Sequence, residues 1–252
     1  MNPRRRKFEI WSIISILLFL AFLLFFIYPI CTLLKQAFTT EDAGFTLDNF
    51  VKFFSKPYYY NTILNSFKVS IAVALVSLAL GILMSYFYSF YRLKGAKFIL
   101  ISSILCCMSA PFIGAYAWIL LLGRSGALTT LLKSIGIKVG SIYGFGGILL
   151  VQATKLYPLV MIYMNGMFSN LDNSLMEASA NLGCSGVKRF LSVILRLSMP
   201  TILAAALLVF MRAFADFGTP LLIGEGYRTF TVEIYKQFLS ETGSDYGFAA
   251  AI

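Results

Sequence analysis

Three ionisable side chains interrupt stretches that are otherwise apolar, and they are the residues best placed to attract a charged species. Lys155 lies about ten residues into one such stretch, and Arg212 and Asp216 share another. Because Arg212 and Asp216 are four positions apart on one helix face, they can form an internal ion pair. Alternatively, one or more of the three charges lines a path for a substrate, in which case Arg212 is the better candidate for attracting an anionic or chelated group.

The sequence offers little for covalent catalysis or metal binding. It has no His, and its four cysteines are scattered: Cys31, Cys106, Cys107 and Cys184. This excludes a Ser/His/Asp triad, a His-based metal site and an evenly spaced disulfide framework. Asp216 and Cys107 alone suggest an intramembrane enzyme, and no constellation with catalytic spacing accompanies them. We expect no catalytic residue, no metal site and no cofactor.

The composition is that of a membrane protein. Of 252 residues, 59% are hydrophobic and 13% are charged, against roughly 25% charged in soluble domains. The net charge of +10 would suggest nucleic acid as the partner of a soluble protein. Here, however, the Lys and Arg residues flank long apolar runs, which is typical of proteins beside an anionic bilayer surface. We therefore expect membrane lipid, and no nucleic acid, as a partner.

Five stretches with few or no charges are long enough to cross a hydrocarbon core of about 30 Å. They are residues 10–34, 69–91, 98–123, 145–168 and 200–223. The chain turns apolar again after Gly247 and ends at Ile252, so a sixth helix would be truncated. The predicted fold class is an all-α integral membrane protein, a polytopic bundle of about six transmembrane helices.

Several prolines and glycines would disturb these helices and would suit a gated pathway, because freed backbone groups in a membrane need protein or a water-filled cavity beside them. Pro and Gly are also generally common in membrane helices, which is the favoured explanation for any single one of them. The positions are Pro111, Gly114, Pro158, Gly218 and Pro220.

A basic cluster at residues 4–7 precedes the first span and predicts a cytoplasmic N-terminus under the positive-inside rule. The apolar run of residues 10–34 exceeds the roughly 7–15 residues of a signal-peptide core, so it is expected to remain as a membrane helix. Alternation of the spans then puts residues 169–199 in the cytoplasm and residues 225–246 outside.

The cytoplasmic loop 169–199 is more structured than a simple tether. Ser174 and Glu177 have the spacing of a capping box, so a helix should start at Ser174. Gly183 suits the left-handed conformation that ends helices. A helix of about two turns is too short to be stable alone. Since its residues Ala178 and Ser179 are small, we expect another surface to dock on it.

A second helix is predicted after Ser185, because apolar residues including Phe190 and Ile194 recur there at three- and four-residue spacing. This helix would lie in the membrane interface. Pro200 suits the first turn of the following span, where its missing N–H costs little.

The residues that carry a family resemblance in this loop are Glu177, Ala178, Gly183, Phe190, Ile194 and Pro200. Their spacing resembles the EAA loop of permease subunits from binding-protein-dependent ABC importers of the type I, MetI-like fold. Ser179 departs from the pattern, which usually has a second Ala, and residues 196–199 lack the usual Leu-Pro. The resemblance implies that the loop docks in a cleft of a cytoplasmic ATPase, through Ser174, Glu177, Ala178, Ser179, Gly183, Phe190 and Pro200.

The resemblance extends over about residues 45–252. FTLDNFVKFFSKPYYYNTILNSFKVS (45–70), SAPFIGAYAWILLLGRSGALT (109–129) and KLYPLVMIYMNGMF (155–168) are similar to membrane segments of that family. FADFGTPLLIG (214–224) and the later TFTVEIYKQF are similar to its ferric-iron branch, although permeases for polyamines and 2-aminoethylphosphonate carry related segments. The resemblance therefore implies ferric iron as the substrate, with those two classes as alternatives.

The implied domains are residues 1–36, a basic cytoplasmic segment with the first transmembrane helix, and residues 61–252, an ABC importer transmembrane domain incomplete at its C-terminus.

The chain lacks a GxxxxGK[ST] phosphate loop, so it is expected to be non-catalytic and to use a separate ATPase dimer. Further implied partners are an extracytoplasmic substrate-binding protein and a second permease half, either a continuation of this chain, a homologue or a second copy.

The implied location is the bacterial inner membrane. A stand-alone secondary transporter is an alternative that the charged spans permit, but the sequence has no visible inverted repeat.

Overall fold

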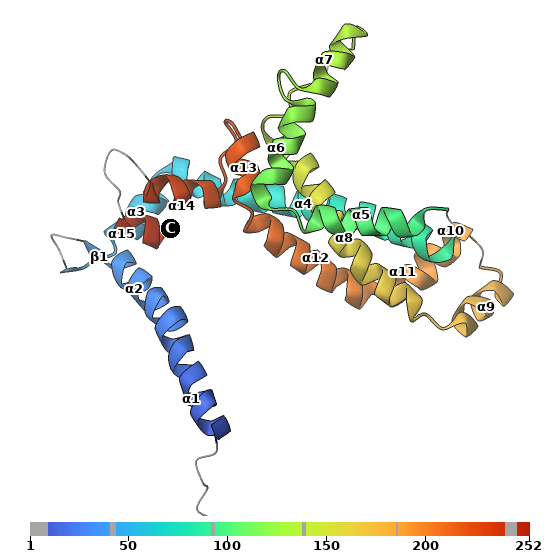
Figure 1. The fold of residues 1–252 in the computed structure, drawn as a ribbon, viewed down its shortest axis with the longest axis horizontal. Helices are drawn as coiled ribbons and strands as arrows, with labels where there is room; N and C mark the ends of the chain where they lie inside the picture. Colours follow the sequence, from blue (N-terminus) through green and yellow to red (C-terminus); the bar gives the residue numbers. More distant parts are fainter. Residues whose placement is uncertain (1–9, 41–43, 92–93, 138–139, 185, 240–245) are drawn as a thin grey trace, which may run out of the picture. The chain divides into compact units, whose positions relative to one another are not determined.

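The computed structural model describes residues 10–40, 44–91, 94–137, 140–184, 186–239 and 246–252. This part of the chain is almost entirely helical, with one short antiparallel ribbon (Figure 1). The elements are α1 (Ile10–Phe22), η1 (Leu23–Ile27, a π-helical turn), α2 (Tyr28–Ala37), β1 (Thr39–Thr40), β2 (Gly44–Phe45), α3 (Asp48–Ser55), α4 (Pro57–Phe90), α5 (Ala96–Cys107), α6 (Pro111–Leu122), α7 (Ala127–Ser134), α8 (Phe145–Ser169), α9 (Asn173–Asn181), α10 (Gly186–Arg189), η2 (Phe190–Ile194, also π-helical), α11 (Leu195–Leu197), α12 (Met199–Phe214), α13 (Gly218–Ile223), α14 (Phe230–Phe238) and α15 (Tyr246–Ala251).

Among the described residues, four helices are long and apolar enough to cross a membrane, and a bent pair can provide a fifth crossing. The four are Ile10–Ala37, Pro57–Phe90, Phe112–Ser134 and Phe145–Ser169. The bent pair, Gly186–Leu197 with Met199–Phe214, turns by 72° at its break. The all-α membrane fold predicted from composition is thereby confirmed.

The third predicted span, residues 98–123, is wrong as a single helix. It is divided into α5 and α6 by a break at residues 108–110. Ala110 has an extended backbone, with φ −60° and ψ 147°. The ring of Pro111 disfavours the helical conformation at the residue before it, so α6 starts at the proline.

The fifth predicted span, residues 200–223, is also divided, because α12 ends at Phe214 and α13 starts at Gly218. Asp216 lies in the break between them. Gly114 and Pro158, which were expected to disturb their helices, lie inside α6 and α8 without ending either.

The chain divides into two compact units. Unit 1 contains the described residues up to Tyr60 together with Glu233–Ile252, and unit 2 is Asn61–Val232. The predicted division into residues 1–36 and 61–252 remains a prediction.

In unit 1, the helices α2 and α3 both contact α15. Asn49 Nδ2 donates to the carbonyl oxygen of Ala37, 3.2 Å away. The carboxylate of Glu233 is buried and accepts hydrogen bonds from Tyr58 Oη at 3.2 Å and Gln237 Nε2 at 2.9 Å. These bonds satisfy an acid that would otherwise be costly to bury. By contrast, α1 has no buried residue, so its apolar side chains are free to face lipid.

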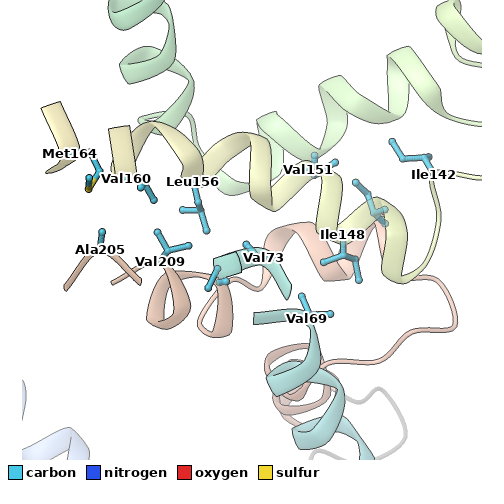
Figure 2. Close-up of a cluster of buried hydrophobic side chains, with 14 of the residues drawn as sticks. Val69, Val73, Ile142, Ile148, Val151, Leu156, Val160, Met164, Ala205 and Val209 are labelled. Atoms are coloured by element: carbon cyan, nitrogen blue, oxygen red, sulfur yellow. The ribbon is translucent and has the colours of Figure 1, made fainter. Parts of the chain in front are cut away.

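In unit 2, α5 and α12 both contact α8, and Figure 1 shows these helices running side by side with α4. The buried core lies between α4, α8 and α12 (Figure 2). Side chains from the three helices converge there, including Val73, Val160 and Val209, each fully buried. Because lipid is as apolar as these side chains, close van der Waals packing holds such helices together.

Small residues form a seam along the buried face of α4. Polar members of the seam bond to α8, with Ser77 Oγ donating to the carbonyl oxygen of Ala153 at 3.4 Å and Ser85 Oγ to the side chain of Asn165. Small side chains at such spacing allow two membrane helices to approach closely. The buried residues of α4 are Thr62, Ser66, Val69, Ser70, Val73, Ala74, Ser77, Gly81 and Ser85.

Gly81 is the tightest point of this seam. A Cβ atom added to Gly81 would lie 2.5 Å from Val160 Cβ and 2.8 Å from the carbonyl oxygen of Tyr157. Only glycine therefore fits here without a shift of α4 away from α8.

Replacing Gly81 with Leu should weaken the packing of α4 on α8 by about 1–3 kcal/mol, the usual cost of overfilling a packed contact. We expect a lower temperature of aggregation for the detergent-purified protein, measured by gel filtration of heated samples. Gly166→Leu is the matched control, because Gly166 on α8 is exposed and a Cβ atom there meets nothing within 4 Å. Equal thermal stability of the two variants would contradict the close contact.

Candidate functional site

The short helix α9 begins one residue earlier than predicted. Its N-cap is Asp172, whose Oδ1 accepts a hydrogen bond from the Ser174 backbone N–H at 2.9 Å. The predicted capping box, with Ser174 as N-cap and Glu177 closing it, is therefore wrong. Since α9 starts at Asn173, Ser174 lies within the first turn, and Asp172 takes the cap position.

The cap carries a charge. The backbone N–H of Ser174 bonds to the ionised carboxylate and holds the pKa of Asp172 below its usual value. The folded pKa is thus lower than the unfolded one. The contribution of the cap is complete above the unfolded pKa and is lost as the pH falls through the folded pKa.

The end of α9 is built as the sequence predicts. Gly183 has φ +77°, in the left-handed region that favours glycine. The Gly183 N–H donates to the carbonyl oxygen of Ala180 at 2.9 Å, and the Cys184 N–H donates to that of Ser179 at 3.0 Å. This pair of bonds is a Schellman motif, and it satisfies carbonyl groups left free at the helix end.

One face of α9 is open. Glu177 and Ala178 are exposed, whereas Ser179 is buried. Figure 1 shows α9 at the end of unit 2 away from α13. A two-turn helix with exposed small residues gives another surface close access to its backbone.

The predicted second helix is present as α10, η2 and α11 in succession, while Ser185, its expected cap, lies outside the described residues. Phe190 is half-buried and packs against Tyr86 of α4, with ring centroids 4.7 Å apart, and Ile194 is buried. Pro200 lies in the first turn of α12, as expected. This segment therefore packs on the helix bundle through Phe190 and Ile194.

A cavity of about 350 Å³ lies among α5, α6, α8 and the break after α12. It brings together all three charges singled out from the sequence, Lys155, Arg212 and Asp216. Its other lining residues are Cys107, Phe112, Leu156, Ala215, Phe217 and Gly218.

Asp216 is held in place by two donors on one of its oxygens. Its Oδ2 accepts from Gln152 Nε2 at 3.0 Å and from Thr219 Oγ1 at 2.6 Å. Its backbone carbonyl oxygen accepts from Thr231 Oγ1 at 3.1 Å. Gln152 and Thr219 are fully buried and were missed from the sequence. The sequence signal for Gln152 was its own polarity: it is an uncharged polar residue in an apolar stretch, three positions before Lys155.

The internal ion pair considered for Arg212 and Asp216 is not formed between these two described residues. The helical i, i+4 spacing assumed for it does not hold, because α12 ends at Phe214 and Asp216 lies beyond it. Neither Lys155 nor Arg212 has a hydrogen bond or an ion pair within the described part of the chain. Arg212 is exposed and Lys155 is half-buried.

A further charged pair, also missed from the sequence, joins Arg124, just after α6, to Glu225, just after α13. The Arg124 guanidinium also lies 5.2 Å from the ring centroid of Tyr143. Glu225 has φ +48°, an uncommon conformation for a residue other than glycine. Both side chains are largely exposed, so the pair contributes about 0–1 kcal/mol to stability.

Comparison with known families agrees with this architecture. Residues 77–252 match the family described as "Binding-protein-dependent transport system inner membrane component". The structure is also similar to a crystal structure of a bacterial ABC transporter involved in the import of the acidic polysaccharide alginate. That chain has 21% sequence identity and a TM-score of 0.76, over 95% of this chain and 88% of the other.

Curated relatives share more of the sequence. The ferric transport system permease protein FbpB of Actinobacillus pleuropneumoniae is 28% identical over 98% of this chain, but only 36% of the relative is covered. The spermidine/putrescine transport system permease protein PotB of Haemophilus influenzae is 27% identical, over all of this chain and 90% of the relative. This chain thus spans less than half the length of the ferric permeases it matches.

Removing the cap with Asp172→Ala should speed hydrogen exchange at the Ser174 amide and along α9, because this short helix loses its side-chain acceptor. Mass spectrometry of the detergent-solubilised protein measures the exchange, corrected for the intrinsic rate at each pH. Protection in the unmodified protein should fall as the Asp172 carboxylate is protonated. Asp172→Asn, which keeps an acceptor that does not titrate, should show no such fall. Identical exchange in all three proteins would contradict the charged cap.

Proposed function

We propose that this chain, which belongs to the family of binding-protein-dependent transport system inner membrane components, forms part of the membrane pathway of an ABC importer. It would act as a non-catalytic permease subunit and span the inner membrane several times with a cytoplasmic N-terminus. The observation that carries the proposal is the exposed face of α9 at Glu177 and Ala178.

The proposed role of the loop follows from the low stability of α9 as an isolated helix. A helix of nine residues is marginal by itself in water, and Glu177 and Ala178 face away from the rest of unit 2. A cleft in a cytoplasmic ATPase would cover this face. Ser174, Glu177, Ala178, Ser179, Gly183, Phe190 and Pro200 are the residues we assign to this coupling loop.

We propose three partners for this chain. It has no phosphate loop, so an ATPase dimer would bind the nucleotide. A dimer presents two clefts and this chain has one such loop, so a second permease half would occupy the other cleft. A substrate-binding protein outside the membrane would deliver the cargo.

The substrate we propose is ferric iron, supported by the similarity to FbpB over nearly the whole chain. Polyamines, supported by the similarity to PotB, and 2-aminoethylphosphonate are the alternatives. The cavity with Lys155, Arg212 and Asp216 is the proposed point at which the pathway meets the cargo.

The complex itself tests the assignment. We expect the full-length gene product, purified from its native membrane in mild detergent, to retain an ATPase with a phosphate loop, identified by mass spectrometry. Glu177→Lys should release that ATPase, whereas Asp48→Lys, the same charge change at an exposed acid in unit 1, should retain it. If other membrane complexes survive the procedure and no ATPase is found, the protein is a stand-alone transporter.

Gly183→Val should uncouple ATP hydrolysis from uptake. A β-branched residue in the left-handed conformation costs about 1–2 kcal/mol, which shifts the docked loop population roughly 5- to 30-fold. ATPase activity and cargo uptake would be compared in proteoliposomes. Gly183→Asn is the control, because Asn tolerates this conformation better. Normal uptake with Gly183→Val would contradict a docking role for this helix end.

Radiolabelled uptake in cells that carry the whole transport operon should identify the cargo. We expect accumulation of ferric iron that depends on Glu177, and no accumulation of spermidine or 2-aminoethylphosphonate. Accumulation of either of these in place of iron would assign the protein to that substrate class.

A further inference from the structure

The charges around the cavity are not balanced. Lys155 and Arg212 supply two positive charges, and Asp216 supplies one negative charge. Among the described residues, the two cations have no ion-pair or hydrogen-bond partner, whereas the carboxylate already has two donors. The charge left for a ligand to neutralise is therefore positive.

The hydrogen bonds to Asp216 explain why its carboxylate forms no ion pair with Lys155 or Arg212. Gln152 and Thr219 both donate to Oδ2, which anchors the carboxylate to α8 and to the start of α13. The anchored group forms no ion pair with Arg212, although the two are close in sequence. Gln152 acts as a positioning residue, since it is fully buried and holds Asp216 in this place.

The remaining lining strengthens the effect of the two cations. Phe112, Leu156, Ala215 and Phe217 surround the charged groups with apolar surface. Electrostatic attraction is stronger in such surroundings than in bulk water. A guanidinium and an ammonium at one apolar cavity are suited to an oxyanion, which accepts hydrogen bonds from both.

We propose that this cavity binds the oxyanion group of the cargo, so that iron would pass it as an anionic chelate. A free polyamine would be repelled. This inference rests on the proposed function, because it treats the cavity as part of the transport pathway. A carboxylate of an iron chelate and a phosphonate share the required chemistry.

Cys107 lines the cavity and provides a direct probe of its charge. In the full-length protein in membrane vesicles, the other cysteines would be replaced with Ser. Two methanethiosulfonate reagents of similar size would then be compared, one with a sulfonate and one with a trimethylammonium group. The Cys107 thiolate attacks the reagent sulfur, forms a mixed disulfide and releases methanesulfinate. Any change in thiolate population affects both reagents equally, so the ratio of their rates reports the local charge.

We expect the sulfonate reagent to be favoured, and the rate ratio to fall about tenfold in the Lys155→Gln/Arg212→Gln double variant, as focused charge in a cleft implies. Asp216→Asn should raise the ratio, which simple disruption of the cavity would not do. Lys133→Gln is the control, because it removes an exposed cation on α7 that does not line the cavity. A ratio unchanged in the double variant, or no reaction of Cys107 with either reagent, would overturn the proposal.

Protection of Cys107 distinguishes the sources of the oxyanion. Ferric citrate, 2-aminoethylphosphonate and spermidine would each be added before the reagents. Slower modification with ferric citrate or with the phosphonate supports the proposal and names the cargo class. Protection by spermidine, or by none of the three, overturns it. Since this assay needs no ATPase, an anion preference without a co-purifying ATPase would refute only the importer assignment, and the reverse result would refute only the anion site.

Discussion

The hydrogen bonds of the Asp216 carboxylate are the interaction on which much of unit 2 depends. Its side chain joins α8 to α13 through Gln152 and Thr219, and its backbone carbonyl binds Thr231 at the start of α14. A helix break in an apolar environment exposes backbone groups that need partners. The break between α12 and α13 is tolerated because it adjoins both a polar network and a cavity. The same network leaves Arg212 and Lys155 available to that cavity.

The sequence predicted the helical membrane fold well, because long uncharged runs have few other uses in a protein of this composition. It also identified Lys155, Arg212 and Asp216 as candidates to line a substrate path, and the structure places all three at one cavity. The failures came from treating apolar runs as unbroken helices. The ion pair of Arg212 and Asp216 required a helix that continues past Phe214, where α12 ends. The third span required a helix that runs unbroken across Pro111, where α6 begins.

Other features depend on contacts between distant segments. The bond from Gln152 to Asp216 crosses 64 positions in the chain, so no local pattern reveals it. The spacing of Ser174 and Glu177 had suggested Ser174 as the cap, but Asp172 takes that position. The two candidates lie two positions apart, and only the backbone conformation decides between them. By contrast, Gly183 was predicted correctly, because a positive φ at a helix end has a strong local signal.

The seam of small residues has a mechanical consequence for the proposed transport function. Ser77 and Ser85 of α4 contact α8 through small side chains, and at Gly81 between them the two helices leave no room for a methyl group. Helices in such close contact cannot slide past each other without a steric clash, since packed interfaces shift between discrete arrangements and do not deform continuously. If the chain acts in the proposed importer, we expect α4 and α8 to move as one rigid pair. The part of α8 between Lys155 and its last residue, Ser169, covers 14 residue steps, or roughly 21 Å. A tilt applied near α9 would therefore be carried along this pair of helices to the cavity.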